Sequence, residues 1–195
     1  STDPRLHLGF NAFSGSGDVT AEVVYVNYGT REDFMKLVEM GVPLKGKVAI
    51  ARYGGNFRGY KAKFAEQQGM VGLVVYTDPK DSGFTRGDVY PKGPFYNETT
   101  IQRGSMLTLD FTGDPLTPNR PALPLDGPEK IKRDDPATVD FHTIPVTPIG
   151  YGAAKEILSR MTGADVPASW QGGLPFPYKL TGGADLKVRV MVDQK

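Results

Sequence analysis

The fold is decided by residues 47–76, KVAIARYGGNFRGYKAKFAEQQGMVGLVVY. The segment opens with Lys47 to Tyr53 (KVAIARY), which predicts a strand. It closes with the continuous apolar run Val71 to Tyr76, which is typical of a strand buried on both faces. Between these runs, Arg58 to Gln68 predicts a helix that Gly69 ends. A strand, a helix and a strand of these lengths predict a right-handed parallel βαβ unit.

Further helices and strands flank this unit on both sides. Glu22 to Tyr28 predicts a strand, and Thr30 with Asp33 gives the pattern of a capping box at the start of a helix that Gly41 ends. The remaining predicted elements are a short strand within Ile101 to Leu107, a segment Ile144 to Ile149 that leads into a helix near Gly152 to Met161, and an alternating last strand at Leu186 to Val192. The sequence therefore predicts a mixed α/β (α+β) fold with a small central sheet, about three helices and long Gly/Pro-rich loops.

The composition of the chain excludes several classes of protein. The chain has 195 residues with no cysteine, which suits one domain and excludes a disulfide framework or a thiolate zinc site. A net charge of +1 gives no field for nucleic acid or anionic lipid, and no apolar run is long enough to span a bilayer. The 24 glycines and 16 prolines predict ordered loops, of which Gly113 to Pro124 is expected to be extended and stiff.

The two ends of the chain carry expectations of their own. Residues 1–18 are expected to form an extended N-terminal segment, and Ser1 to Leu8 lacks the apolar stretch of a signal peptide. The alternating last strand reaches Lys195 with no cap after it. We therefore expect residues 1–195 to be a single domain cut from a longer protein.

Catalytic motifs are scarce. His7 and His142 belong to no histidine–carboxylate pattern, so each is expected to be a packed or surface histidine. Residues 14–17 (SGSG) carry part of a nucleophile elbow without the flanking strand and helix, which favours a flexible turn. A stand-alone hydrolase that uses Ser14 or Ser16 remains a minor alternative.

Two polar motifs have simple interpretations. Asp78 to Asp81 (DPKD) lacks the bidentate glutamate of a calcium loop, so a solvated turn is expected. Asn97 with Thr99 forms a glycosylation sequon, which matters only in a protein secreted by a eukaryote.

One group of cations stands out. Arg58, Lys61 and Lys63 crowd the first turns of the predicted central helix, where an exposed cation opposes the helix dipole at a cost of about 0.3–1 kcal/mol. Free helix N–H groups together with an arginine form a corner that binds carboxylate or phosphate. On the residues alone, solvated cations on a surface turn remain the favoured interpretation. Tyr60, Phe64 and Ala65 of the same helix are expected to face inward.

The order of the motifs carries a family resemblance that extends from about Phe13 to Val192. The motifs are Val24 to Leu37 (VYVNYGTREDFMKL), Gly46 to Tyr53 (GKVAIARY), Phe57-Arg58-Gly59, Gly69 to Pro79 (GMVGLVVYTDP), Tyr90-Pro91, Gln102-Arg103-Gly104, Gly113 to Pro118 (GDPLTP) and Ile144 to Tyr151 (IPVTPIGY). Together they resemble the protease-associated (apical) domain of glutamate carboxypeptidase II and the N-acetylated α-linked acidic dipeptidases.

The resemblance implies that this chain is one domain of a larger protein, called the parent protein below, and that catalysis and substrate recognition belong to different domains. In that family the domain is inserted into a peptidase domain that holds two zinc ions and the general base, so this chain is expected to contain no catalytic residue and not to hydrolyse peptides alone. Arg58 matches the arginine that grips the α-carboxylate of the C-terminal substrate residue. Ser105 matches an asparagine that helps to hold the glutamate γ-carboxylate, and its shorter side chain does not imply a strict glutamate preference.

The resemblance also implies a metal and partners. Thr117 and Arg120 match loop positions that give oxygens to a calcium ion between the two domains; Arg120 replaces a tyrosine, so only its backbone carbonyl carries over. The implied partners are the peptidase domain of the same parent chain, a peptide with a free C-terminus and a second copy of the parent, in an extracytoplasmic location (secreted, periplasmic or membrane-anchored).

A second interpretation comes from the transferrin receptors, which use a related apical domain without peptidase activity. The exposed loops between Gly83 and Pro124 favour such a protein-interaction module, whereas Phe57-Arg58-Gly59 favours the peptidase branch.

Overall fold

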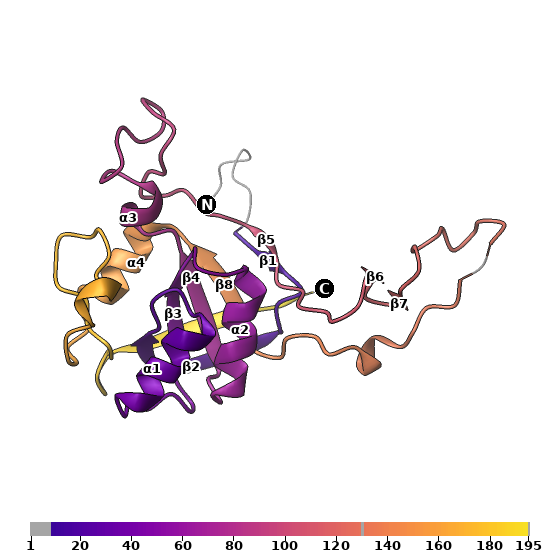
Figure 1. The fold of residues 1–195 in the computed structure, drawn as a ribbon, viewed down its shortest axis with the longest axis horizontal. Helices are drawn as coiled ribbons and strands as arrows, with labels where there is room; N and C mark the ends of the chain where they lie inside the picture. Colours follow the sequence, from indigo (N-terminus) through magenta and orange to yellow (C-terminus); the bar gives the residue numbers. More distant parts are fainter. Residues whose placement is uncertain (1–8, 130, 195) are drawn as a thin grey trace.

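The computed structural model of the chain describes residues 9–129 and 131–194. Its centre is a five-stranded sheet in the order β8-β4-β3-β2-β9 (Figure 1). The parallel strands are β2 (Gly17–Tyr25), β3 (Val48–Arg52), β4 (Gly72–Tyr76) and β8 (Val146–Ile149), and β9 (Lys187–Val192) runs antiparallel to β2. The mixed α/β fold expected from the sequence is confirmed.

The predicted βαβ unit is present, and a second one precedes it. Helix α2 (Arg58–Gln67) joins β3 to β4, which pair in parallel. Helix α1 (Arg31–Glu39) joins β2 to β3 in the same way, and α1 and α2 lie beside each other over the sheet (Figure 1). Two of the three inner strands, β3 and β4, are buried along their whole length, as a strand covered on both faces should be.

Helix α1 begins at the predicted capping box. The Thr30 hydroxyl accepts a hydrogen bond from the Asp33 backbone N–H at 3.1 Å, and the Asp33 carboxylate accepts one from the Thr30 N–H at 3.0 Å. Beyond the other end of the helix, Gly41 adopts a positive φ of 70°, a conformation that glycine tolerates best.

The remaining elements are short. They are β1 (Asn11–Ala12), the four-residue helix α3 (Pro79–Ser82), β5 (Gly104–Ser105), β6 (Gly113–Asp114), β7 (Thr117–Pro118), the 3₁₀ turn η1 (Pro136–Thr138), helix α4 (Tyr151–Leu158) and the 3₁₀ turn η2 (Ala168–Trp170). Strand β1 pairs in parallel with β5 outside the main sheet. Within the N-terminal segment expected at residues 1–18, residues 1–8, including His7, lie outside the described part of the chain.

Residues 109–129 and 131–141 form an arm that leaves the sheet domain (Figure 1). Part of the loop predicted to be extended is instead a hairpin of β6 and β7. Among the described residues, the buried hydrophobic core has no member between Met106 and Ile144. The core therefore belongs to the sheet and its helices, and the arm adds nothing to it.

Two expectations from the sequence are wrong. Tyr60 is 43% exposed, and the neighbouring Lys61 takes the inward position on α2. The Asp78 to Asp81 turn is not solvated, because Asp78 is fully buried and Asp81 pairs with the buried Arg52 at 3.5 Å. No helix within residues 9–129 and 131–194 combines the length and the apolar character needed to cross a membrane.

Candidate carboxylate-binding site

The start of α2 lacks the capping groups that α1 has. Phe57 occupies the N-cap position and makes no side-chain hydrogen bond there, and the first turn holds no acidic residue. The first N–H groups of a helix have no partner within the helix, and they carry the positive end of its dipole. This end of α2 is therefore suited to an anionic group from outside the helix.

Arg58 adds a cation at the same place. Its side chain is half-buried, with the guanidinium carbon 5.6 Å from the ring centroids of both Tyr53 and Phe57. Nη1 donates a long hydrogen bond of 3.4 Å to the Ser105 carbonyl oxygen, and the buried Nε has no partner among the described residues. Because a buried unpaired N–H is costly, Arg58 retains donors for an acceptor that the described chain does not supply.

Glycines allow β5 to approach α2 closely. A Cβ on Gly104 would collide with the Arg58 guanidinium, and a Cβ on Gly59 would collide with the Met106 carbonyl oxygen. The Ser105 hydroxyl accepts a hydrogen bond from the Leu107 backbone N–H at 3.1 Å, which leaves its own proton available for another acceptor. The structure thus brings together Arg58 and Ser105, the two residues expected to bind substrate.

Lys61 has a different role from the one that the sequence favoured. Its side chain is fully buried, and Nζ donates to the carbonyl oxygens of Tyr28 and Gly54 and to Asn56 Oδ1, the last two at 2.7 Å. Burial lowers the pKa of Lys61 to about 7. The solvated-cation interpretation is wrong for Lys61, which holds the Gly54 turn against α2 and is not available to a ligand.

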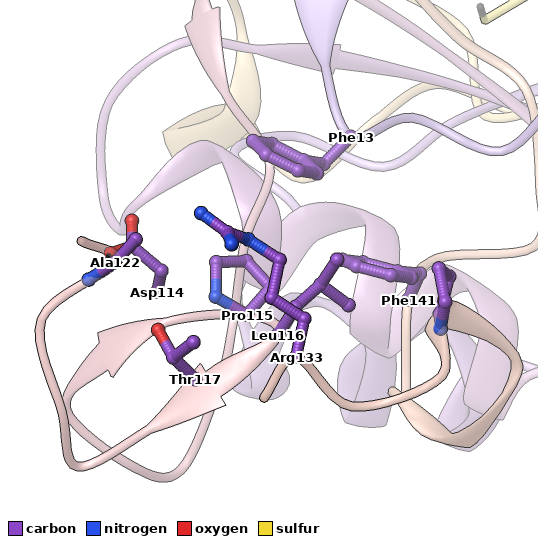
Figure 2. Close-up of a pocket in the computed structure, with 9 residues that line it drawn as sticks. Phe13, Asp114, Pro115, Leu116, Thr117, Ala122, Arg133 and Phe141 are labelled. Carbon is purple, nitrogen blue, oxygen red and sulfur yellow. Dashed lines mark hydrogen bonds between the residues drawn. The ribbon is translucent and has the colours of Figure 1, made fainter. Parts of the chain in front are cut away.

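Thr117 and Arg120 lie together in the arm. Thr117 is buried, its hydroxyl donates to the Arg120 carbonyl at 3.3 Å, and the Arg120 N–H donates to the Thr117 carbonyl at 3.1 Å. Thr117 also lines a largely apolar pocket between the hairpin and the ring of Phe13, shown in Figure 2.

These oxygens fit only part of a metal site. Calcium takes six to eight oxygen ligands, and this turn offers three: the Thr117 hydroxyl, the Arg120 carbonyl that accepts from it, and the Thr117 carbonyl that accepts from the Arg120 N–H. Within the described residues, no group of three histidine, cysteine, aspartate or glutamate side chains is placed to hold a metal ion. A calcium ion at Thr117 and Arg120 would need most of its ligands from another part of a larger protein.

Ser14 and Ser16, the serines of the hydrolase alternative, make hydrogen bonds that join segments of the fold. The Ser14 hydroxyl donates to the Gly15 carbonyl at 2.9 Å and accepts from the Val146 N–H at 2.7 Å. Ser16 Oγ accepts from the Gln194 N–H at 2.9 Å. In the described structure the ring of His142 contacts Glu66 and Met106 rather than either serine. The arrangement expected of an activated nucleophile is therefore not formed at Ser14 or Ser16.

Sequence reasoning did not single out the aromatic walls of the site. Tyr53 follows β3 directly, and its hydroxyl donates to the Gln102 carbonyl at 2.9 Å, which ties the end of β3 to the segment that leads into β5. Burial raises the pKa of Tyr53. The position of Tyr53 at the carboxyl end of a parallel strand, just before glycines and a helix start, was the available signal.

The sheet, its two βαβ units and the cationic start of α2 define an α/β domain with a cationic corner. Residues 19–109 match the family model described as "PA domain". The chain is 38% identical over 185 residues to "Aminopeptidase NAALADL1" of Mus musculus, which covers 92% of this chain and 24% of that protein. It is 51% identical over 113 residues to "Probable glutamate carboxypeptidase" of Arthroderma benhamiae, which covers 55% of this chain and 16% of that protein.

Among solved structures, "Aminopeptidase from Aneurinibacillus sp. strain AM-1" is 26% identical and covers 48% of this chain and 17% of that one. Its TM-score of 0.34 is too low to support an argument.

The resemblance recognised from the sequence is confirmed. Residues 19–109 form a PA domain, and the chain is similar over most of its length to a segment of glutamate carboxypeptidase-type peptidases. The chain spans about a quarter or less of the length of these curated relatives, as a domain of larger peptidases does.

Proposed function

We propose that this chain is the non-catalytic substrate-recognition domain of a larger zinc-dependent peptidase and binds the C-terminal carboxylate of the peptide substrate. The observation that carries the proposal is the Arg58 guanidinium at the uncapped start of α2, with its buried Nε unpaired. The similarity to peptidases named as glutamate carboxypeptidase and aminopeptidase supports it. In this proposal the two zinc ions and the general base belong to a peptidase domain of the same parent chain, and the parent is an extracytoplasmic homodimer.

The chemistry of the corner suits a carboxylate. Two N–H groups of a guanidinium match the two oxygens of a carboxylate, and hydrogen bonds to charged groups contribute about 1.5–3 kcal/mol. Tyr53 and Phe57 flank the guanidinium and partly shield it from water, which strengthens such a bond. The Ser105 carbonyl contacts the guanidinium, and the hydroxyl of the same residue would offer one donor to the side chain of the last substrate residue, which favours a broader preference than glutamate alone.

Calcium enters the proposal as a link between domains. Thr117 and the Arg120 carbonyl supply oxygens from the arm, and the peptidase domain supplies the other ligands. The ion would fix the base of the arm against that domain, and it has no role in the reaction itself.

Kinetics of the full-length parent protein test the role of Arg58. We expect Arg58→Ala to raise KM at least tenfold (about 1.4 kcal/mol or more) for peptides with a free C-terminal carboxylate, with a much smaller effect on C-terminally amidated peptides. Arg31→Ala is the matched control, because Arg31 is an exposed arginine at the start of α1. Unchanged KM in Arg58→Ala would contradict carboxylate recognition.

A second function, a protein-interaction module of a transferrin-receptor-like parent, is favoured by the arm, whose described residues add nothing to the core. Metal analysis of the full-length parent separates the two functions. Two bound zinc ions per chain support the peptidase, and a zinc-free folded parent supports the interaction module.

A further inference from the structure

His142 forms a second polar cluster, where the arm rejoins the sheet domain. The side chain is only 8% exposed and contacts two different elements. Its Nδ1 lies 2.9 Å from Glu66 Oε2 on α2, and its Nε2 lies 2.8 Å from the carbonyl oxygen of Met106, the residue after β5. The ring is therefore a packed histidine, as expected, but it also bridges the helix that carries Arg58 and the strand that carries Ser105.

Both ring nitrogens need a proton to make these contacts. A carbonyl oxygen only accepts, so Nε2 must donate to Met106; an ionised carboxylate also only accepts, so Nδ1 must donate to Glu66. The described contacts are those of a doubly protonated, charged imidazolium. A neutral ring has one proton and would face one of the two oxygens with a lone pair.

Glu66 is held in its ionised form. Burial raises the pKa of the Glu66 carboxyl, but hydrogen bonds from His142 and from the backbone N–H groups of Thr143 and Ile144 outweigh burial and hold the pKa below its ordinary value. Glu66 is the charged group that the described structure places against His142; the other two neighbours, the Met106 carbonyl and the Thr108 hydroxyl at 3.3 Å, are uncharged.

The cluster meets the candidate site at one atom. The Met106 carbonyl that accepts from His142 is the same atom that packs against Gly59, the residue after Arg58. Met106 also follows Ser105 directly in the chain. A change in the hydrogen bond to this carbonyl therefore acts on the contact between the start of α2 and β5, where Arg58 and Ser105 meet.

We propose that the His142–Glu66 ion pair is a pH-dependent clamp that positions the Ser105 strand against Arg58. His142 and Glu66 are positioning residues and touch no substrate. The clamp is complete when Glu66 is ionised and both ring nitrogens of His142 carry a proton, and it weakens when rising pH removes one of these two ring protons. Its importance for substrate binding rests on the proposed function, whereas the clamp itself does not.

NMR of the protein tests the clamp without a ligand. We expect the backbone amide signals of residues 104–107 to shift between pH 5.5 and pH 8.5 in the wild type, together with the ring signals of His142. In His142→Gln, which keeps an N–H donor for Met106 but does not titrate, the shift at residues 104–107 should disappear. His7→Gln is the matched control, because it removes the only other histidine and should leave the shift intact.

A double-mutant cycle with His142→Gln and Glu66→Gln measures the pair directly. Glu66→Gln retains an oxygen that accepts from Thr143 and Ile144, so loss of folding is not the expected outcome. We expect the coupling between the two side chains to change the folding equilibrium about fivefold more at pH 5.5 than at pH 8.5, since charged hydrogen bonds are stronger than neutral ones. The exposed pair Arg160–Glu156 is the control and should show the same coupling at both pH values.

The outcomes separate the clamp from the proposed function. If residues 104–107 do not respond to pH, or if the His142–Glu66 coupling is equal at pH 5.5 and pH 8.5, the clamp is overturned. If both respond while Arg58→Ala leaves KM unchanged in the parent protein, the clamp stands and the carboxylate role fails.

Discussion

At the scale of single residues, Asp78 organises one end of the sheet. Its buried carboxylate accepts hydrogen bonds from the Tyr76 hydroxyl at 3.0 Å, the Lys80 N–H at 2.8 Å and the Gly173 N–H at 2.7 Å, and from the Tyr178 hydroxyl. The pattern DPKD predicted a solvated turn, because the partners from residues 173 and 178 lie about a hundred positions later in the chain. No local pattern carries that information.

Removal of this carboxylate should be costly. We expect Asp78→Ala to lower the free energy of unfolding by about 3–5 kcal/mol, because two tyrosine hydroxyls and two backbone N–H groups lose their acceptor in a buried site. Urea denaturation followed by circular dichroism measures the change. Asp126→Ala, in the exposed part of the arm, is the control and should change stability by less than about 0.5 kcal/mol. A similarly small effect at Asp78 would show that water replaces the carboxylate.

The candidate site was predictable only in part at this scale. Arg58 could be singled out because a cation at a helix start opposes the dipole, and its unpaired Nε agrees with that reasoning. Ser105 was identified through the family resemblance, since it sits in a two-residue strand that pairs with β1 outside the main sheet. Arg58 and Ser105 meet through a tertiary contact, and the hydrophobic periodicity of the sequence gives no information about such a contact.

At the scale of elements, α2 shows why apolar residue types alone did not identify the helix face that packs against the sheet. Tyr60 is exposed and stacks on Phe64 at 5.9 Å, whereas Phe64 itself is partly buried against the core, as expected. Lys61, Ala62 and Ala65 are fully buried. The backbone carbonyls of the Gly54 turn need donors, and a buried lysine supplies them. By contrast, the limits of α1, β3 and β4 agree with the sequence, because caps, glycines and continuous apolar runs mark them locally.

The lowered pKa of Lys61 has a consequence for α2 and for stability. The unfolded chain holds the lysine proton up to about pH 10.4, whereas the native state begins to lose it near pH 7. In that window the unfolded state binds more protons, so the free energy of unfolding should rise with pH, by at most about 1.4 kcal/mol per pH unit. Above pH 10 the sign reverses, because burial raises the pKa of Tyr28 to about 12 and also raises the pKa of Tyr25 and Tyr76.

Urea denaturation at intervals from pH 7 to pH 11 measures this curve. We expect a maximum near pH 10 in the wild type and loss of the rising limb in Lys61→Met. The exposed Lys36→Met is the control and should retain that limb. Stability that stays level between pH 7 and pH 10 would show instead that the three oxygen acceptors hold the ammonium form, since a neutral amine can donate only two hydrogen bonds.

At the scale of the whole molecule, the chain divides into a sheet domain with a dense core and an arm without one. The arm is held together by its own hydrogen bonds, such as the one from the Asp134 N–H to the Leu116 carbonyl at 2.8 Å. The sequence predicted an extended loop here from its prolines, and the short hairpin was not foreseen, because two-residue strands leave no alternating pattern. Strands β2, β3 and β4 and the helices between them were predictable in outline from the sequence. The pairing of β8 with β4 and the direction in which the arm leaves the domain were not.

This division predicts that the sheet domain folds without the arm. Residues 108 and 142 lie close together, with Thr108 Oγ1 3.3 Å from His142 Nε2, so a short Gly/Ser linker can replace residues 110–139. Because a shorter loop has a smaller closure entropy, the free energy of unfolding should stay the same or rise by up to about 2 kcal/mol. Urea denaturation and the backbone NMR spectrum measure this. The matched control replaces residues 163–185, whose Leu174, Tyr178 and Leu180 are buried in the core, and should unfold the domain. Unfolding of the domain when the arm is shortened would contradict this prediction and show that the arm contributes to the stability of the core.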